Sequence, residues 1–321
     1  MNAFKNTIQS EVDLFDKKFK NILSPKSKLL YKITNYITSR SGKQIRPICC
    51  IIAAGLGGGV TEKTFRGAIL IELLHTATLI HDDIVDDAQI RRSSFSLNTI
   101  WKNKIAVLTG DYFLAKGLTL AVRNKDYDIL NKVSSVVEKI VEGELLQIEK
   151  TKKLNLNEKD YFKIINLKTG SLFTCAFSVG GLSSHADTST VNELTKLGII
   201  IGQLFQIKDD ILDYSESKLI GKNSSNDIKE GKINLPLLYA LRKMKIIEKG
   251  QVLSILRKKM KTSKEINLVK SIVIKYKGLE YANVFMEKNY QEALAIIDKF
   301  SENKYKNTMQ LLLRFLMERK K

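Results

Sequence analysis

Two groups of aspartates on helical segments carry the clearest chemistry in this sequence. In residues 73–92, LLHTATLIHDDIVDDAQIRR, a helical period places Asp82 and Asp86 on one face. His75 and Thr78 continue this stripe at steps of three and four residues. Carboxylates one turn apart repel by about 1–4 kcal/mol at the dielectric of a protein surface, and a hard cation between them and an anionic ligand removes that cost. The spacing therefore indicates a magnesium site, although an isolated acidic cluster is often only a solvated helix end.

The second half of the chain repeats the pattern. In residues 201–214, IGQLFQIKDDILDY, the stripe contains Gly202, Gln206, Asp209 and Asp213. Two D-D-x-x-D motifs about 130 residues apart, each on an otherwise apolar helix, are difficult to explain as surface decoration. Burying such carboxylates without cations would cost several kcal/mol each. The predicted Mg²⁺ ligands are Asp82, Asp83, Asp86, Asp209, Asp210 and Asp213.

Composition predicts one large all-α domain over residues 1–321. The chain has only three prolines and is rich in helix-compatible residues, and no Pro-, Gly- or Ser-rich linker divides it. Helices are expected over residues 105–122 and 129–149, followed by a polar loop at 150–158 and a turn at 180–190. Thr61 and Asn157 are expected N-caps.

The net charge of +19 raises the question of a polyanionic partner. Because the lysines are scattered and are not interleaved with stacking aromatics, we expect no nucleic-acid binding. Residues 47–60 are too short and too rich in glycine to span a bilayer, so we expect no transmembrane segment and at most transient membrane contact. Cys49, Cys50 and Cys175 have neither disulfide-like nor zinc-like spacing, which favours a reducing cytoplasm.

The ordered motifs of this chain resemble those of the trans-isoprenyl diphosphate synthases, most closely the long-chain all-trans polyprenyl diphosphate synthases. The matching blocks run through most of the chain and include both aspartate motifs. They are GKQIRP at residues 42–47, HDDIVD with the following arginine pair, GD at 110–111, GELLQ at 143–147, Lys168–Thr169, FQIKDDILD at 205–213, and GKNSSNDIKEGKINLPL from residue 221. Ser93 and Asn234 depart from the family pattern, which usually has Gly and Thr at these positions.

This resemblance implies a helical bundle of the isoprenoid synthase type with a central elongation cavity, and a Mg²⁺-dependent condensation of isopentenyl diphosphate with an allylic diphosphate primer. It also implies a homodimer, and it assigns roles to polar and basic residues. Lys43, Arg46, His75, Arg91, Arg92, Lys222 and Lys232 would bind the diphosphates, and Lys168, Thr169 and Gln206 would steady the departing diphosphate.

The same resemblance assigns product length to Ala77 and Thr78, the positions five and four before the first aspartate. Neither is an aromatic that would block the cavity, and one helical turn rises about 5.4 Å, roughly one isoprene unit. We therefore expect a long-chain product of the kind used for quinone side chains. A lower floor formed by Leu70, Leu74 or Val141 is an alternative.

Three other functions are compatible with parts of the sequence. The chain could be a short-chain synthase that makes farnesyl or geranylgeranyl diphosphate, or a catalytic or accessory subunit of a heteromeric synthase. A terpene cyclase could share one aspartate motif, but the second D-D-x-x-D and the GKQIRP segment favour chain elongation. Sequence alone leaves open the carbon number of the product, the preferred primer, and the choice between homodimer and heteromer.

Overall fold

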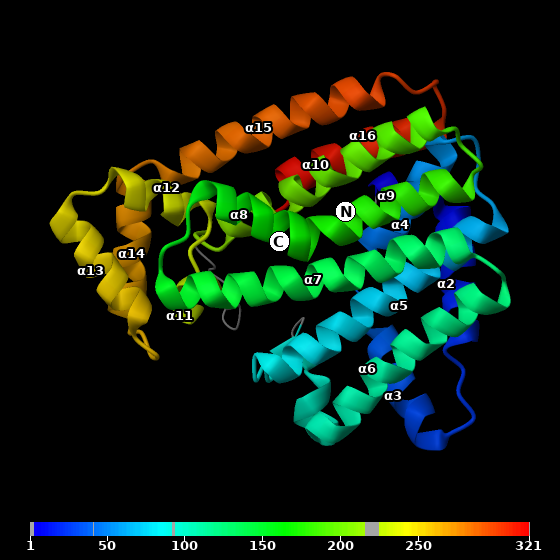
Figure 1. The fold of residues 1–321 in the computed structure, drawn as a ribbon, viewed down its shortest axis with the longest axis horizontal. Helices are drawn as coiled ribbons and strands as arrows, with labels where there is room; N and C mark the ends of the chain where they lie inside the picture. The colour runs from blue at the N-terminus through cyan, green and yellow to red at the C-terminus, as the bar shows by residue number, and fades with distance from the viewer. Residues whose placement is uncertain (1–2, 41, 92–93, 216–224, 321) are drawn as a thin grey trace. The chain divides into compact units, whose positions relative to one another are not determined.

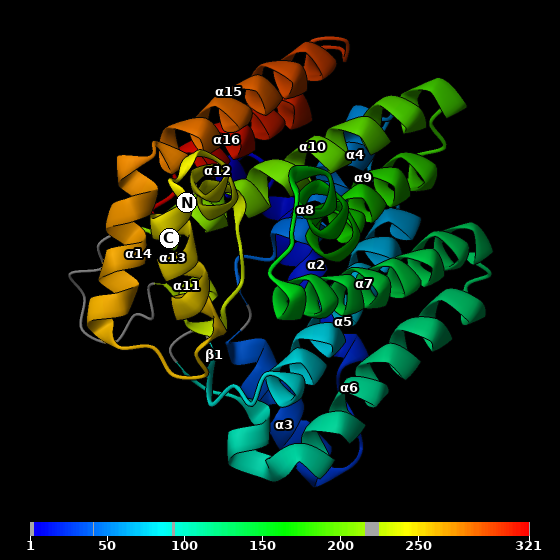
Figure 2. The same cartoon turned by 60° about the vertical axis from the view of Figure 1, so that its left-hand side comes forward.

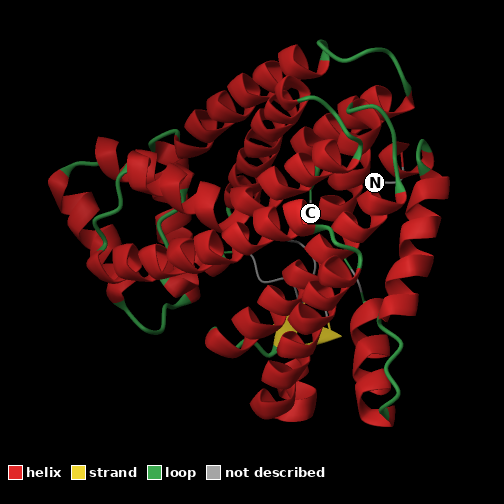
Figure 3. Ribbon diagram, turned by 45° about the vertical axis from the view of Figure 1, so that its right-hand side comes forward, coloured by secondary structure: helices red, strands yellow, loops and turns green. Residues whose placement is uncertain are grey.

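The structure, a computed structural model, describes residues 3–40, 42–91, 94–215 and 225–320. These residues are almost entirely helical, and the short strands β1 (Ile90–Arg91) and β2 (Ser94–Phe95) form an antiparallel hairpin (Figures 1 and 3). The predicted all-α fold is therefore confirmed.

The chain divides into two compact units. Unit 1 contains Met1–Val136, Leu172–Gly198 and Ile297–Leu312, and unit 2 contains Val137–Ser171, Ile199–Ile296 and Leu313–Lys321. The single domain inferred from composition stays a prediction.

Unit 1 is organised around α5 (Glu62–Val85), the helix that carries the first aspartate motif. This helix packs along α6 and against α4. The other elements that lie wholly in unit 1 are α1 (Ala3–Asn6), α2 (Gln9–Ile22), α3 (Lys28–Ser39), α4 (Ile45–Leu56), the β1–β2 hairpin and α6 (Leu97–Arg123). Helix α9 (Ser171–Ser183) also belongs to unit 1, except for its first residue.

A polar cap fixes the start of α5, and apolar packing fixes its acidic end. At its start, Thr61 and Thr64 form a reciprocal capping box, in which the Thr61 side chain accepts a hydrogen bond from the Thr64 N–H, as an N-cap should. Near its acidic end, Ile80 belongs to a buried cluster with Leu97 of α6 and Ile33 of α3. Burial of this cluster holds the last turn of α5, and hence its aspartates, against two other helices.

Unit 2 contains the second motif and most of the C-terminal helices. Its helix α12 packs against α8 and α14, and the short α11 packs against α13 and α14. The helices are α8 (Glu158–Ile165), the π-turn η1 (Asn166–Gly170), α11 (Asn226–Glu230), α12 (Leu235–Lys243), α13 (Ile246–Arg257), α14 (Ser263–Lys275) and α15 (Gly278–Ile297). The last residue of α15 belongs to unit 1, and three more helices have several residues in each unit: α7 (Tyr127–Lys153), α10 (Thr188–Leu212) and α16 (Lys304–Glu318).

Several predicted boundaries were wrong. The helix expected over residues 105–122 begins at Leu97, and the loop expected from residue 150 begins only after α7 ends at Lys153. The turn expected from residue 180 begins after α9 ends at Ser183. In each case the helix continues through polar or small residues, because packing along its length outweighs their weak local preference for a turn.

Among the described residues one helix, α6, is long and apolar enough by length and composition to cross a membrane. Core helices of globular proteins pass the same test. In α6, Lys102 has a positive φ of 69°, which kinks the helix within its first turns.

Candidate active site

The first aspartate motif lies at the C-terminal end of α5, in unit 1. The helix ends at Val85, and Asp86 is its C-cap, with its N–H donating to the Asp82 carbonyl at 2.9 Å. Asp82 is half-buried, whereas Asp86 is exposed. The expectation that both carboxylates belong to one helical face therefore applies to a helix end, where Asp86 already leaves the regular helix.

Asp83 and Arg91, which were assigned to metal and to diphosphate, are paired with each other. The Arg91 Nε atom lies 2.5 Å from Asp83 Oδ1, and Asp83 is buried. The β1–β2 hairpin folds Arg91 back over the end of α5, as its pairing with Ser94 shows. Arg92, the second predicted diphosphate ligand here, lies outside the described residues, as does Ser93.

Arg46 and His75 form a second pair in unit 1. Arg46 Nη1 lies 3.0 Å from His75 Nε2, and the guanidinium stands over the Phe173 ring at 4.7 Å. Because a guanidinium can only donate hydrogen bonds, His75 Nε2 must accept, so the ring is neutral and carries its proton on Nδ1. The aromatic ring and the imidazole thus fix the fork of Arg46, which lies in the first turn of α4, just after the half-buried Lys43.

A cavity in unit 1 lies beside these residues. Its lining includes the predicted residues His75, Asp83 and Arg91, together with Arg40 and Glu72, which the sequence did not suggest. Ala77 and Thr78 do not line it. Ala77 is fully buried, and the Thr78 hydroxyl donates to the His75 carbonyl at 2.9 Å, so their assignment to product length stays a prediction.

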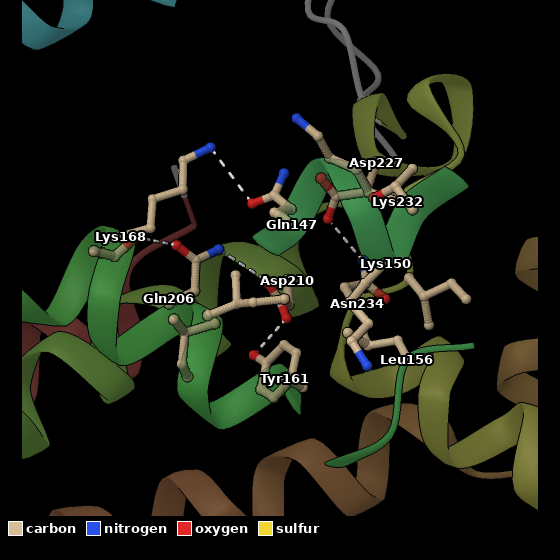
Figure 4. A pocket seen from close by; sticks show the side chains of 15 residues that line it. Gln147, Lys150, Leu156, Tyr161, Lys168, Gln206, Asp210, Asp227, Lys232 and Asn234 are labelled. Atoms are coloured by element: carbon tan, nitrogen blue, oxygen red, sulfur yellow. Dashed lines mark hydrogen bonds between the residues drawn. The ribbon is translucent and has the colours of Figure 1, made fainter. Parts of the chain in front are cut away.

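The second motif opens onto a pocket in unit 2, which Figure 4 shows from close by. It brings together Lys168, Thr169, Gln206, Asp210 and Lys232 from three segments that are distant in sequence. Lys168 and Thr169 lie in the π-turn η1, a distortion that is frequent at functional sites. The predicted Lys222 lies outside the described residues.

Close backbone packing places the π-turn against its neighbours. A Cβ atom on Gly202 would lie 2.6 Å from the Gly170 Cα, and one on Gly143 would lie 2.9 Å from the Lys168 backbone nitrogen. Any larger residue would push the turn away, so Gly143 of the GELLQ block and Gly202 of the second stripe are both required by contact.

A chain of hydrogen bonds connects the π-turn to the aspartates. The Thr169 hydroxyl donates to Gln206 Oε1 at 2.8 Å, and Gln206 Nε2 donates to Asp210 Oδ1 at 2.9 Å. The other Asp210 oxygen accepts from the Tyr161 hydroxyl at 2.7 Å and from the Leu235 N–H at 3.1 Å. Asp210 is therefore the buried centre of this hydrogen-bond network. We expect it to orient Gln206 in addition to contributing its charge to the site.

Lys168 reaches the same pocket from the other side. Its Nζ forms an ion pair with Glu144 and donates to Gln147 Oε1 at 3.4 Å. Lys232 forms an ion pair with Glu230 at 2.5 Å. Both lysines are thus held at the pocket by carboxylates, and an incoming diphosphate would compete with these carboxylates for them.

Three carboxyl groups of unit 2 are destabilised in their charged form. Burial, reinforced by the charge of Asp227, raises the pKa of Asp213 to about 6. Burial likewise raises the pKa of Asp210, again with repulsion from Asp227, and the pKa of Asp227 itself. A cation near these groups would stabilise their charged forms and so offset both the burial and the repulsion that raise their pKa values.

The donor set fits a hard cation. The Asp213 Oδ2 atom is buried and has no hydrogen-bond partner among the described residues. Carboxylate oxygens are the ligands that Mg²⁺ prefers. Within the described parts of the chain, no group of three or more His, Cys, Asp or Glu side chains is already arranged as a complete metal site.

Arg319 is a site residue that the sequence did not reveal. Its Nη2 lies 2.8 Å from Asp209 Oδ1 and donates to the Phe205 carbonyl at 2.6 Å, while its guanidinium stands 4.2 Å from the Phe205 ring centre. The Arg319 side chain is only 5% exposed, compared with 44% for Asp209. The buried guanidinium therefore fixes the orientation of the more exposed carboxylate.

Asn234 explains a departure from the family pattern. Its amide oxygen caps α12 by accepting from the Leu237 N–H at 3.3 Å, and it accepts from the Tyr214 hydroxyl at 2.7 Å. Its amide nitrogen donates to Asp227 Oδ2 at 2.9 Å. Threonine would also cap a helix, but the longer amide combines the cap with a hydrogen bond to the buried carboxylate.

Comparison with known proteins settles the family. Residues 27–273 match the model of the polyprenyl synthetase family. The chain belongs to this family. It is 32% identical, over 92% of its length and 91% of the relative's, to an all-trans-nonaprenyl-diphosphate synthase (geranyl-diphosphate specific) of Rhodobacter capsulatus. A geranylgeranyl diphosphate synthase of Saccharolobus solfataricus is 29% identical over 100% of this chain and 98% of that relative.

A solved structure of this family is similar throughout. A polyprenyl synthase from Caulobacter crescentus, complexed with calcium and isoprenyl diphosphate, has a TM-score of 0.92 and 27% identity, covering 99% of this chain and 97% of that one. The predictions of a prenyltransferase and of the polyprenyl diphosphate synthase family are confirmed.

For this polyprenyl synthetase we predict that Arg319 positions Asp209. Arg319→Gln should raise the magnesium concentration for half-maximal activity by roughly tenfold, because the carboxylate loses its fixed orientation. Arg319→Lys, which keeps the charge but not the planar fork, should recover part of this loss. Steady-state rates across a magnesium titration measure the effect.

The matched control is Arg314→Gln, an exposed arginine on α16, the helix that ends one residue before Arg319. Equal magnesium dependence of the Arg314 and Arg319 variants would show that the ion pair only stabilises the fold.

Proposed function

We propose that the chain is a Mg²⁺-dependent synthase of a long-chain all-trans polyprenyl diphosphate, which condenses isopentenyl diphosphate with an allylic diphosphate. The observation that carries this proposal is the pocket of unit 2, where Asp210 and Asp227, two carboxyl groups with raised pKa values, line the same cavity as Lys168, Thr169, Gln206 and Lys232. Such a set suits a cation and a polyphosphate together.

The chain's own residues would divide the chemistry as follows. In unit 1, Arg46, held by His75 and Phe173, would bind one diphosphate through its planar fork. In unit 2, Lys168 and Thr169 would donate to the departing diphosphate, with Gln206 orienting the Thr169 hydroxyl. The aspartates of the first motif, in unit 1, and those of the second, in unit 2, would each hold magnesium, which would supply positive charge to neutralise a diphosphate. The allylic carbon–oxygen bond would break, releasing pyrophosphate, and the isopentenyl double bond would attack the allylic carbon to form the new carbon–carbon bond. The resulting cation would lose a proton, which the released pyrophosphate can accept, to give the product longer by one isoprene unit.

Two observations favour a long product. A relative of similar length is named as a nonaprenyl diphosphate synthase, and neither Ala77 nor Thr78 carries an aromatic ring. A geranylgeranyl diphosphate synthase is nearly as similar, so a short-chain product is the second candidate. The length of the product distinguishes the two.

Incubation of the pure protein with isopentenyl diphosphate, farnesyl diphosphate and magnesium tests the proposal, with the products sized by chromatography. We expect products longer than geranylgeranyl diphosphate. Asp82→Asn and Asp209→Asn should each lower the rate roughly a hundredfold or more, because charge on the leaving group is no longer neutralised.

Asp87→Asn is the matched control. Asp87 is exposed, lies beside the motif, and has a positive φ of 48°, a conformation that asparagine adopts readily. Its rate should stay close to that of the wild type. Absence of elongation by the wild-type protein would contradict the enzymatic proposal, and products no longer than geranylgeranyl diphosphate would contradict only the chain length.

We also propose a homodimer that forms through α6. Leu108, Leu118 and Val122 are exposed large hydrophobic residues at helical steps along one side of this helix. Exposed large apolar side chains on one side of a helix are typical of a helix that packs against a partner. Sedimentation equilibrium should give the mass of two chains, and Leu118→Asp should shift it towards one chain while Val284→Asp, on α15, should not.

We propose a cytoplasmic location. Cys49, Cys50 and Cys175 are all buried free thiols, as expected where thiols stay reduced. Cell fractionation that recovered the protein outside the cytoplasm and its membrane surface would contradict this.

A further inference from the structure

The most exposed apolar side chains of unit 2 gather at the two ends of α13. Ile246 and Ile247 begin the helix and are 90% and 86% exposed, and Met260, in the loop that follows it, is 88% exposed. Isolated exposed apolar residues are common, but adjacent isoleucines with almost their whole surface in water are not. Figures 1 and 2 show α13 beside α14 at the edge of this unit.

The outer face of α13 is suited to a flat surface. Its buried residues Val252, Ile255 and Leu256 define the inner face. At 100° per residue, Ile246 and Ile247 each lie about 130° around the helix from the centre of that face, on its two sides, so the midpoint between them is opposite the buried face. Gly250 shares the outer side, and a Cβ atom there would meet no atom within 4 Å.

Positive charge surrounds these apolar residues. Between Arg242 and Lys264 the chain has nine basic residues and one acidic residue, so this short segment supplies eight of the nineteen net charges. The single acid, Glu248, is already bound to Lys275 and to the Tyr276 hydroxyl. Lys245 and Lys249, on either side of the isoleucines, have no carboxylate within ion-pair distance among the described residues.

We propose that α13 and the loop after it form a docking surface for an anionic lipid bilayer. Lysines beside the headgroups would be attracted to their negative charge, while Ile246, Ile247 and Met260 would enter the boundary of the acyl chains. A nucleic acid would match the charge but would have no use for exposed aliphatic side chains, and the segment has no aromatic residue to stack on bases.

The purpose of this surface rests on the proposed function. A polyprenyl diphosphate combines a long apolar tail with an anionic head, so a bilayer is its stable environment. An enzyme that rests on the bilayer could pass such a product into it without exposing the whole tail to water.

Co-sedimentation of the full-length protein with lipid vesicles tests the proposal. The wild type should bind vesicles of phosphatidylcholine and phosphatidylglycerol, bind vesicles of phosphatidylcholine alone much more weakly, and be released by salt. The double variant Ile246→Ser/Ile247→Ser should bind the anionic vesicles roughly tenfold more weakly. Lys245→Glu/Lys249→Glu should weaken binding by a similar factor.

Val284→Ser and Lys288→Glu, at exposed positions of α15 in the same unit, are the matched controls and should bind like the wild type. The proposal is overturned if the wild type does not bind anionic vesicles, or if the double isoleucine variant binds as tightly as the Val284 variant. Elongation of farnesyl diphosphate in detergent, measured on the same samples, should be unchanged in all variants. Vesicle binding without elongation would contradict the proposed function alone, and elongation without vesicle binding would contradict the docking surface alone.

Discussion

Repulsion among buried carboxylates is the constraint on which the second aspartate motif depends. Asp210 is buried and Asp213 and Asp227 are half-buried, and burial together with the charge of Asp227 raises the pKa of the first two. The surroundings offset part of this cost with hydrogen bonds from Tyr161, Asn234 and backbone N–H groups. Apolar residues of similar size at these positions would give a more stable fold, so the cluster indicates a functional use of the carboxylates. Neutralisation by a bound cation is the use that we propose.

The arrangement around this cluster controls orientation as well as charge. The π-turn brings Thr169 to Gln206, Gln206 is fixed by Asp210, and Arg319 fixes Asp209. Each polar group that would contact a diphosphate or a cation is thus already held by a second group. In unit 1, Phe173 and His75 hold Arg46 in the same manner. Such preorganisation lowers the reorganisation needed when charge develops on a leaving group.

The sequence predicted the parts that depend on local periodicity and failed where distant segments meet. The caps at Thr61 and Asn157 and the all-helical fold follow from spacing and residue type, and they were confirmed. The two aspartate stripes extend past their helices, because α5 ends at Val85 and α10 at Leu212, so Asp86 and Asp213 lie just beyond the helix ends. The pairing of Asp83 with Arg91 requires a β-hairpin that the periodicity of apolar residues does not predict. The pairing of Asp209 with Arg319 joins residues more than a hundred positions apart. Both depend on tertiary packing, as does the exposure of Ile246 and Ile247, which a sequence would place in a core.

Thermal unfolding of the metal-free protein between pH 4 and pH 8, compared between wild type and Asp213→Asn, tests the central claim most directly. The pKa of Asp213 is raised from 3.8 to about 6 in the folded chain, so the folded state resists an ionisation that the unfolded chain accepts. As the pH rises from about 4 to 6, the wild type should therefore lose stability relative to Asp213→Asn, by on the order of 1–3 kcal/mol, and magnesium should reduce the difference. A difference between the two proteins that is the same at pH 4 and pH 7, with and without magnesium, would contradict the account.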